Sequence, residues 1–412
     1  MKAPQWSRLL SASAWVNQVA ISDDGRRVIG ATFTHDYAAG SRGANRPGTY
    51  GAWVYDAGGN LLWNNTVPAW DGLFSVAISG DGKTAAGGGW AGPERGFLQV
   101  YSGQYGGVLL DVTTIKARVN GIGLSTNGDV MVAAADSVFV YVRDNEKVYK
   151  PAAPATDEIK NQLAGFFEGF VPAIALHPAG TWLAACGRNG KFLVATMAGS
   201  TITAVHTRTL TESTNPGVPG AATNGPPFLG VAIAAQTNEF IVGGGNSVYY
   251  SSLADMRAGA EPVRYDAWDP GAVPPKIVDG VPPRVPENVR WVAISADGTF
   301  FAAVANRKKA LARSGAVLAF KKVPPNAPPV PLWNVALDRN PNGISMDRAG
   351  TILAVADGFP VGVEARFHLF DKAGNRIWEY TTPSMNWPVA VSPDGGAIAA
   401  GGDDGVLYYF LP

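Results

Sequence analysis

The chain contains little that could react or bind a metal. It has one cysteine, Cys186, among 412 residues, which excludes an internal disulfide and any zinc or iron–sulfur site built on several cysteines. Cys186 lies in the apolar segment Leu183-Ala-Ala-Cys-Gly187, so we predict a buried small residue rather than a reactive thiol. The four histidines are scattered and form no His-Glu-x-x-His pair, so we predict no metal site from them.

Charged residues are also scarce. Lysine and arginine together number 33, as do aspartate and glutamate, so the net charge is zero and charged residues make up only 16% of the chain. A neutral chain has no global field that would attract nucleic acid or an anionic membrane, and we expect neither as a partner. No apolar run approaches the roughly 18 residues of a membrane helix, so we expect no membrane span.

The N-terminal segment Met1-Lys-Ala-Pro-Gln-Trp6 lacks the apolar centre of a signal peptide. This absence favours a cytoplasmic protein. A secreted or periplasmic protein whose leader was removed fits the composition nearly as well, because one cysteine and few charges occur in either compartment.

A short repeat runs through the whole chain. An apolar–small–apolar signal occurs eight times, 45 to 61 residues apart, which is the spacing of a four-stranded propeller blade and not of a helical solenoid. The copies are Val19-Ala-Ile-Ser22, Val76-Ala-Ile-Ser79, Ile122-Gly-Leu-Ser125, Ile174-Ala-Leu-His177, Val231-Ala-Ile-Ala234, Val292-Ala-Ile-Ser295, Ile344-Ser-Met-Asp347 and Val389-Ala-Val-Ser392.

Turn residues follow most copies. Asp-Gly or Asn-Gly pairs, which tolerate positive φ, end at Gly25, Gly82, Gly128, Gly298 and Gly395. The fourth and seventh copies keep the glycine, and in the fifth we expect Asn238 to take its place. A second strand rich in alanine and glycine then follows, such as Thr84-Ala-Ala-Gly-Gly-Gly89, where small side chains would let neighbouring sheets approach near an axis.

One connecting segment has helical periodicity instead. Between residues 151 and 169, Ile159, Leu163 and Phe166 or Phe167 follow Thr156 at helical spacing. We predict a short amphipathic helix here, which would cap one side of the fold.

The last copy contains only three strands before the chain ends at Pro412. The missing fourth strand is predicted at the other end, where Gln5-Trp-Ser-Arg-Leu-Leu10 precedes the first copy. Pairing of residues near 4–10 with residues near 406–411 would close the ring. We predict one all-β domain, residues 1–412, that forms an eight-bladed β-propeller of four-stranded antiparallel blades at about 16–67, 74–114, 120–152, 171–210, 229–268, 290–337, 342–382 and 387–412 plus 4–10.

Two kinds of segment resemble known repeats. Val389-Ala-Val-Ser-Pro-Asp-Gly395, with Ala399-Ala-Gly-Gly402, is similar to the repeats of bacterial and archaeal WD40-like β-propellers. The segments 51–63 and 367–378, each ending in a tryptophan, resemble the PQQ-like repeat of quinoproteins. This resemblance implies a propeller over nearly the whole chain, and it leaves function open because such families include scaffolds, binders and enzymes.

The starts of the innermost strands would surround the mouth of the central channel. The residues predicted there are polar or aromatic: Trp15, Asn17, Phe74, Asn120, Trp291, Asn342, Asn386 and Trp387. They could form a pocket for a sugar, a peptide or a small ligand. They could equally be packing and turn residues.

Insertions lengthen the loops expected on the same face, which we call the loop face. They carry the candidates His35, Asp36, Tyr37, Glu94, Arg95, Arg307, Lys308, Glu364 and Arg366. Binding residues gather where loops are elaborated on a rigid scaffold. We therefore predict a non-catalytic, monomeric scaffold that binds a protein, peptide or glycan through this face.

The alternative is an enzyme of the lyase or hydrolase type with its site at the channel mouth. Its acid and base would converge from several blades, with candidates His35, Asp36, Tyr37, Glu94, Arg95, Glu364 and Arg366. No catalytic residue can be assigned, because no Gly-x-Ser-x-Gly elbow is present.

We predict no cofactor. The neighbouring cysteine pair frequent in quinone dehydrogenases is impossible with one cysteine. A calcium ion in the channel is the one alternative, held by aspartates that recur after second strands. Those aspartates are equally turn formers beside glycine or serine: Asp136, Asp357, Asp403 and Asp404.

Overall fold

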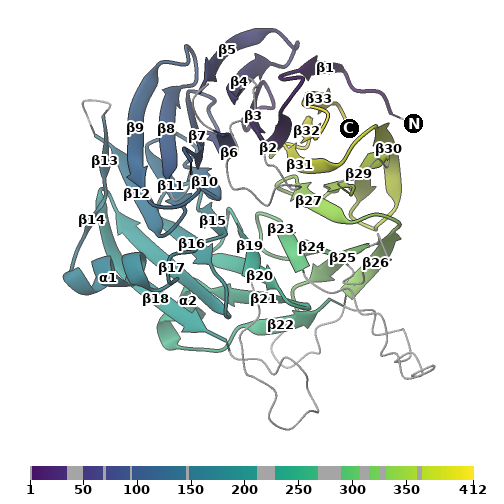
Figure 1. Cartoon of the computed structure of the whole chain (residues 1–412). Coiled ribbons are helices and arrows are strands. Elements are labelled where there is room, and N and C mark those ends of the chain that lie inside the picture. Colours follow the sequence, from purple (N-terminus) through teal and green to yellow (C-terminus); the bar gives the residue numbers. More distant parts are fainter. Residues whose placement is uncertain are drawn as a thin grey trace.

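The computed structural model describes residues 2–34, 50–67, 71–92, 95–144, 148–210, 228–267, 289–306, 315–323, 331–359 and 364–412. These residues form an all-β structure with two short helices. Figure 1 shows the sheets arranged around a common centre, with each innermost strand nearest that centre. The chain is therefore a β-propeller, as the repeat predicted.

Most sheets are antiparallel meanders that run outward in chain order. Four of them have four strands each: β10 (Gly121–Leu124), β11 (Val130–Ala134), β12 (Val138–Arg143) and β13 (Tyr149–Pro151); β19 (Phe228–Ile233), β20 (Glu239–Gly244), β21 (Ser247–Ser252) and β22 (Val263–Asp266); β23 (Val289–Ile294), β24 (Phe300–Asn306), β25 (Gly315–Lys321) and β26 (Pro331–Leu337); β27 (Pro341–Met346), β28 (Ile352–Asp357), β29 (Ala365–Asp371) and β30 (Arg376–Thr382).

Two sheets are larger. One adds the short parallel strand β14 (Ala153–Pro154) to the outer edge of β15 (Ala173–Leu176), β16 (Trp182–Cys186), β17 (Lys191–Ala198) and β18 (Thr201–Thr209). The other joins two meanders through the single pair Phe33 and Gly72: β2 (Trp15–Ile21), β3 (Arg27–Phe33), β4 (Gly51–Asp56) and β5 (Leu61–Thr66); β6 (Gly72–Ile78), β7 (Thr84–Trp90), β8 (Gly96–Ser102) and β9 (Val108–Ile115).

The remaining sheet combines the two ends of the chain. β31 (Asn386–Val391), β32 (Ile398–Gly402) and β33 (Val406–Phe410) are followed outward by β1 (Trp6–Leu9). β1 runs antiparallel to β33, with Trp6 opposite Tyr409 and Leu9 opposite Val406. Figure 1 shows both termini beside this sheet.

The two helices lie in connections between strands. α1 (Asp157–Gly165) begins after Thr156, whose side chain accepts the N–H of Ile159, and it buries Ile159 and Leu163. This confirms the amphipathic helix predicted between residues 151 and 169. α2 (Leu253–Ala258) has a capping box between Ser252 and Asp255.

In five of the repeats, the turn after the innermost strand is built by a serine and an aspartate or asparagine. Ser22 Oγ donates to Asp24 Oδ1 at 2.7 Å and accepts the N–H of Arg27 at 3.0 Å. Gly25 has a φ of 67°, and its N–H donates to the Ser22 carbonyl. A serine and an aspartate or asparagine repeat these side-chain contacts in the turns that follow Ser79, Ser125, Ser295 and Ser392.

The expectation for Asn238 was wrong. Among the described residues other than glycine, only Glu168 and Asn189 have a positive φ. Alignment of the fifth copy on the first puts Thr237, and not Asn238, in the position of Gly25. The Ala234 N–H still bonds to the Glu239 carbonyl, so this copy closes its turn without a left-handed residue.

A second set of contacts connects three of the outer strands to the next meander. The indole N–H of Trp6 donates to the Ala57 carbonyl at 2.9 Å, that of Trp63 to Gly103 at 2.9 Å and that of Trp333 to Lys372 at 3.0 Å. Each indole also covers a glycine of positive φ, because a Cβ on Gly59, Gly106 or Gly374 would lie 2.8 Å from the ring. We call this arrangement the tryptophan–glycine contact.

The contact made by Trp6 generates a stability prediction. Trp6 is buried, stacks on Tyr409 with ring centroids 5.1 Å apart, and belongs to a core cluster shared with β2, β3 and β4. Trp6→Ala should lower the free energy of unfolding by about 3–5 kcal/mol, the usual cost of removing a buried aromatic ring, as measured by urea denaturation.

Leu9→Ala is the matched control. Leu9 lies in the same strand with 62% of its surface exposed, so its loss should change stability by no more than about 0.5 kcal/mol. Equal unfolding midpoints for the two variants would contradict the packing role of Trp6.

Candidate functional site

A cavity of about 340 Å³ lies where the innermost strands begin. We call it the mouth cavity. Its lining is aromatic, amide and cationic: Trp15, Asn17, Gln18, Phe33, Phe74, Arg118, Asn120, Arg290, Trp291, Asn342, Gly343, Ile344, Trp387 and Pro388. Seven of the eight residues that the sequence predicted for the channel mouth are in this set. The eighth, Asn386, is buried beside it.

Asparagines of the lining also join neighbouring sheets. Asn17 Nδ2 donates to the Phe74 carbonyl at 2.7 Å, and Asn120 Nδ2 donates to the Val171 carbonyl at 2.9 Å. Asn342 Nδ2 donates to the Asn386 carbonyl at 2.9 Å. Each bond connects one meander of strands to the next one around the centre. These asparagines therefore serve both as packing residues between meanders and as lining of the cavity.

Arg118 is held at one side of the mouth cavity by three neighbours. Its guanidinium lies 3.6 Å from the centroid of the Phe74 ring and 5.3 Å from that of Trp90. Its Nε donates to Asn120 Oδ1 at 2.9 Å. Stacking together with a directed hydrogen bond fixes the plane of the guanidinium.

Trp387 connects the mouth cavity to a partly buried carboxyl. Its indole N–H donates to Asp403 Oδ1 at 2.7 Å. Burial raises the pKa of Asp403 to about 7, and repulsion from Asp404 adds to the rise, while the hydrogen bond from Trp387 opposes it. Burial also raises the pKa of Asp404, whose carboxylate accepts the Tyr408 hydroxyl at 2.5 Å.

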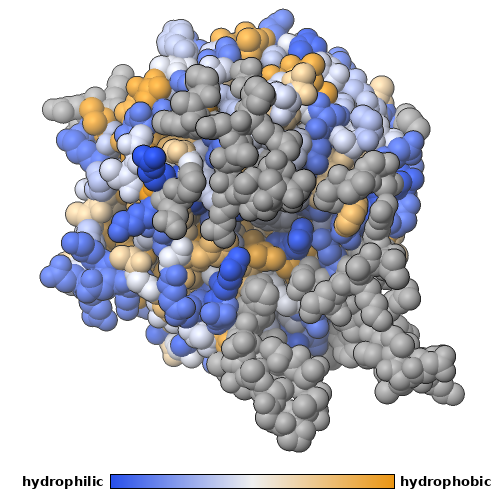
Figure 2. Space-filling model, viewed as in Figure 1, coloured by the Kyte–Doolittle hydropathy of each residue, from blue (hydrophilic) through white to orange (hydrophobic). Residues whose placement is uncertain are grey.

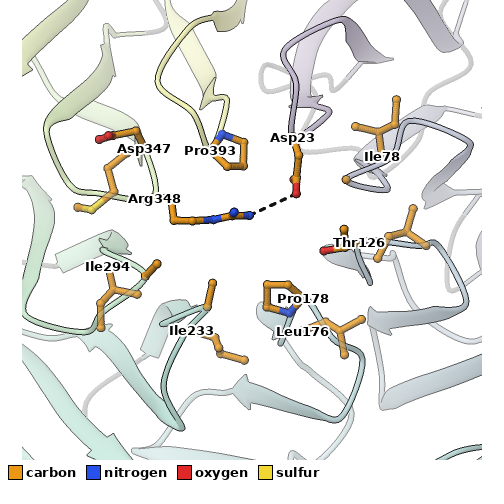
Figure 3. A pocket seen from close by; sticks show the side chains of 15 residues that line it. Asp23, Ile78, Thr126, Leu176, Pro178, Ile233, Ile294, Asp347, Arg348 and Pro393 are labelled. Carbon is orange, nitrogen blue, oxygen red and sulfur yellow. Dashed lines mark hydrogen bonds and ion pairs between the residues drawn. The ribbon is translucent and has the colours of Figure 1, made fainter.

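The opposite end of the channel has a different character. A cavity of about 200 Å³ lies there, lined by apolar side chains such as Ile78, Leu176 and Ile294. Figure 3 shows Arg348 extending across this cavity towards Asp23, and the two form an ion pair of 3.3 Å. This cavity is smaller than the mouth cavity, and the ion pair spans it.

The predicted loop-face residues fall into two groups. His35, Asp36, Tyr37, Glu94, Arg307 and Lys308 lie outside the described residues. Arg366 pairs with Asp338 at 3.6 Å, and the Arg95 carbonyl accepts the N–H of Ala91. Arg95, Glu364 and Arg366 are all absent from the lining of the mouth cavity.

Nothing in the described ranges gathers three or more histidine, cysteine, aspartate or glutamate side chains that could hold a metal ion. Asp357 bonds to His368 Nε2 at 2.8 Å, and both side chains are fully buried. Burial raises the pKa of Cys186, consistent with an inert thiol. A search of the described helices found none with the length and hydropathy of a membrane span.

Sequence reasoning missed the two arginines of the mouth cavity. Arg118 stands two residues before Asn120, and Arg290 stands directly before Trp291. Their position in the sequence, close to predicted mouth residues, could have marked them as candidates for the lining. The direction of their side chains could not be predicted, because neither arginine belongs to the repeated apolar–small–apolar signal.

The fold of the chain is similar to that of several solved structures. The chain is similar to Sqt1 of Chaetomium thermophilum at 15% identity, over 97% of this chain and 95% of that one, with a TM-score of 0.65. It is similar to the same protein bound to the N-terminus of the ribosomal protein L10 at 14% identity, over 98% and 100% of the two chains, with a TM-score of 0.62.

A third similar structure is the β-propeller domain of Cps50 (Swd1) from Myceliophteria thermophila, at 11% identity, over 82% of this chain and 95% of that one, with a TM-score of 0.54. No protein-family model and no curated protein sequence matches the chain. At such identities the similarity establishes the fold alone, which is that of a WD40-like β-propeller.

The raised pKa of Asp403 predicts a pH-dependent stability. The unfolded pKa of an aspartate is about 4, so folding favours the protonated carboxyl. The resulting stabilisation is complete below pH 4 and disappears as the pH rises through about 7. Asp403→Asn keeps an acceptor for Trp387 and cannot ionise. Its urea midpoint relative to the wild type should therefore rise between pH 5 and pH 8.

Asp111→Asn controls for the loss of one charge, because Asp111 is exposed in β9. Its midpoint relative to the wild type should not vary with pH in this range. A difference between Asp403→Asn and the wild type that stays constant from pH 5 to pH 8 would contradict the raised pKa.

Proposed function

We propose that this propeller is a non-catalytic binding protein that takes a peptide segment of a protein partner at the mouth cavity. The lining of that cavity carries the proposal. Five of its lining residues are aromatic, and one of them, Trp291, is 39% exposed. Exposed aromatic side chains in a concave, rigid setting are typical anchors for a partner.

The ionisable groups of the lining favour binding over catalysis. Among the described residues, the only ionisable side chains that line the mouth cavity are Arg118 and Arg290. An arginine stays protonated at neutral pH and cannot act as a general base. No observation favours the lyase or hydrolase alternative, and we do not propose it.

A peptide partner fits the size of the cavity. A volume of about 340 Å³ accepts a few side chains and not a folded domain. Figure 2 shows hydrophobic surface near the centre of the viewed face, bordered by hydrophilic side chains. A protein of the same fold has been observed with the N-terminus of another protein bound to it, and we extend peptide binding to this chain on that analogy. A glycan is the alternative ligand.

We further propose that the chain is a closed ring of eight blades and acts as a monomer. Contacts between innermost strands support the ring, since β2 touches both β6 and β31. Pairing of β1 with β33 supports its closure by the two termini. The turns Asp56–Asn60 and Asp371–Asn375 share the same hydrogen bonds, which supports the kinship of these segments to PQQ-like repeats.

Selection of peptides by the purified full chain tests the proposed function. A random peptide library displayed on phage is enriched on the immobilised protein, and the affinities of enriched peptides are measured by fluorescence anisotropy. Trp291→Ala should weaken binding at least about tenfold, the effect of losing an aromatic anchor.

Tyr105→Ala is the matched control. Tyr105 is also an exposed aromatic residue. It lies in the turn between β8 and β9, and this turn bonds to the Lys83 carbonyl in the turn after β6, at the end of the channel opposite the mouth cavity. The absence of any enriched peptide, or equal loss of binding in both variants, would refute the proposed function.

A further inference from the structure

The outer rim carries a group of basic side chains outside the mouth cavity. His206 and Arg208 belong to β18, and Arg257 belongs to the last turn of α2. Figure 1 shows α2 beside β18, and the two elements are in contact. None of the three residues lines the mouth cavity, so a site formed by them is separate from it and does not depend on the proposed function.

His206 and Arg208 face α2 from the same side of β18. Val205 packs against the core cluster that includes α1, and successive residues of a strand point to opposite faces. His206 and Arg208 therefore share the face turned away from α1. The position of Arg208 agrees, because its Nη2 lies 3.5 Å from the carbonyl oxygen of Ala260, just after α2.

The turn after α2 leaves room for the Arg208 guanidinium. Gly259 ends α2 with a φ of 75°, and a Cβ at this position would lie 3.1 Å from Nη2 of Arg208. The Ala260 carbonyl is a distant acceptor, and the buried Nε of Arg208 has no partner among the described residues. The guanidinium is thus placed over the turn without a strong bond to it.

The positive charge of this group is not neutralised by a carboxylate within the described ranges, where neither Arg208 nor Arg257 forms an ion pair. Asp255 of α2 uses Oδ2 to accept the N–H and the hydroxyl of Ser252. Burial lowers the pKa of His206, and the charge of Arg257 lowers it further. Like charges at short range repel, and an anion bound between them would relieve this repulsion.

We propose that His206, Arg208 and Arg257 form a binding site for a phosphate group. A phosphate carries about two negative charges at neutral pH and several acceptor oxygens, and a guanidinium binds it through paired N–H groups. The arginines approach from two different elements, so one tetrahedral anion can contact both. A carboxylate offers only one charge and two oxygens to the same three groups. The phosphate can belong to a free ion or to a phosphorylated side chain, since the recognising chemistry is the same.

Isothermal titration calorimetry of the full chain tests this site with two probes, inorganic phosphate and N-acetyl-phosphoserine amide, at an ionic strength held constant with chloride. We expect saturable binding of phosphate and no binding of N-acetylserine amide. Tighter binding of the phosphoserine compound than of inorganic phosphate would identify the source as a phosphorylated side chain. Binding of inorganic phosphate alone would identify it as a free ion.

Protein variants locate the binding. Arg208→Gln and Arg257→Gln should each weaken it at least about tenfold, the effect of losing a hydrogen bond to a charged group. Arg208→Lys keeps the charge and loses the planar fork, so it should weaken binding less than Arg208→Gln. Arg26→Gln is the control, because Arg26 is exposed in the turn after β2, and its affinity should equal that of the wild type.

The ring of His206 gives a second readout. Saturating inorganic phosphate should raise the pKa of His206, because the bound anion opposes the charge of Arg257. His177, whose pKa is also lowered by burial, directly follows β15 and is the internal control. Its pKa should not change when both rings are titrated by NMR.

Three results would overturn the proposal: no saturable binding of either probe, an affinity that Arg257→Gln leaves unchanged or that Arg26→Gln lowers equally, or a pKa of His206 that saturating phosphate does not move. Should Arg208→Gln not fold, Arg257→Gln still decides the question, because Arg257 is exposed and its loss should leave the fold intact.

Discussion

The backbone hydrogen bond between one inner turn and the next is the interaction on which the structure depends. The Asp23 N–H donates to Gly80, Thr126 to Pro178 and Arg348 to Pro393. Such bonds form only if each turn presents its N–H and carbonyl in a fixed direction. In the turns of Asp23 and Thr126, a serine and a left-handed glycine provide that direction. In the turn of Arg348, Asp347 takes the place of the serine. Pro178 and Pro393 have no N–H and interrupt the series. The ion pair of Arg348 with Asp23 spans the second interruption.

The tryptophan–glycine contact joins neighbouring meanders at their outer strands, as the turn-to-turn hydrogen bonds join them near the centre. A tryptophan of one outer strand needs a glycine turn in the next sheet, and this requirement explains an exception. Trp378 occupies the corresponding place in β30, yet its buried Nε1 has no hydrogen-bond partner among the described residues. The sheet that follows β30 is the one in which β33 and β1 belong to opposite ends of the chain. No continuous turn joins those strands, so the acceptor that the other tryptophans find is not supplied.

Local signals allowed much of the fold to be predicted. Periodicity and turn residues located the innermost strands, and Thr156 with Ile159 and Leu163 located α1. The mouth residues could be predicted because they start strands whose register the repeat fixes. The prediction that Asn238 replaces the turn glycine failed because asparagine is a common turn residue, whereas Thr237 is the residue that aligns with the glycine of the other copies. The parallel strand β14 and the buried pair of His368 with Asp357 depend on tertiary contacts, which no local pattern reports.

The mouth cavity shows why packing and binding need not compete in a propeller. Three asparagines that line the cavity also donate an amide N–H to a backbone carbonyl of the neighbouring meander: Asn17, Asn120 and Asn342. A lining that is already bonded into the ring moves little when a ligand arrives. For Arg118 this rigidity is direct, because the same Asn120 that joins two sheets also holds its guanidinium. The hydrogen bonds that join neighbouring sheets therefore also fix the orientation of the Arg118 guanidinium.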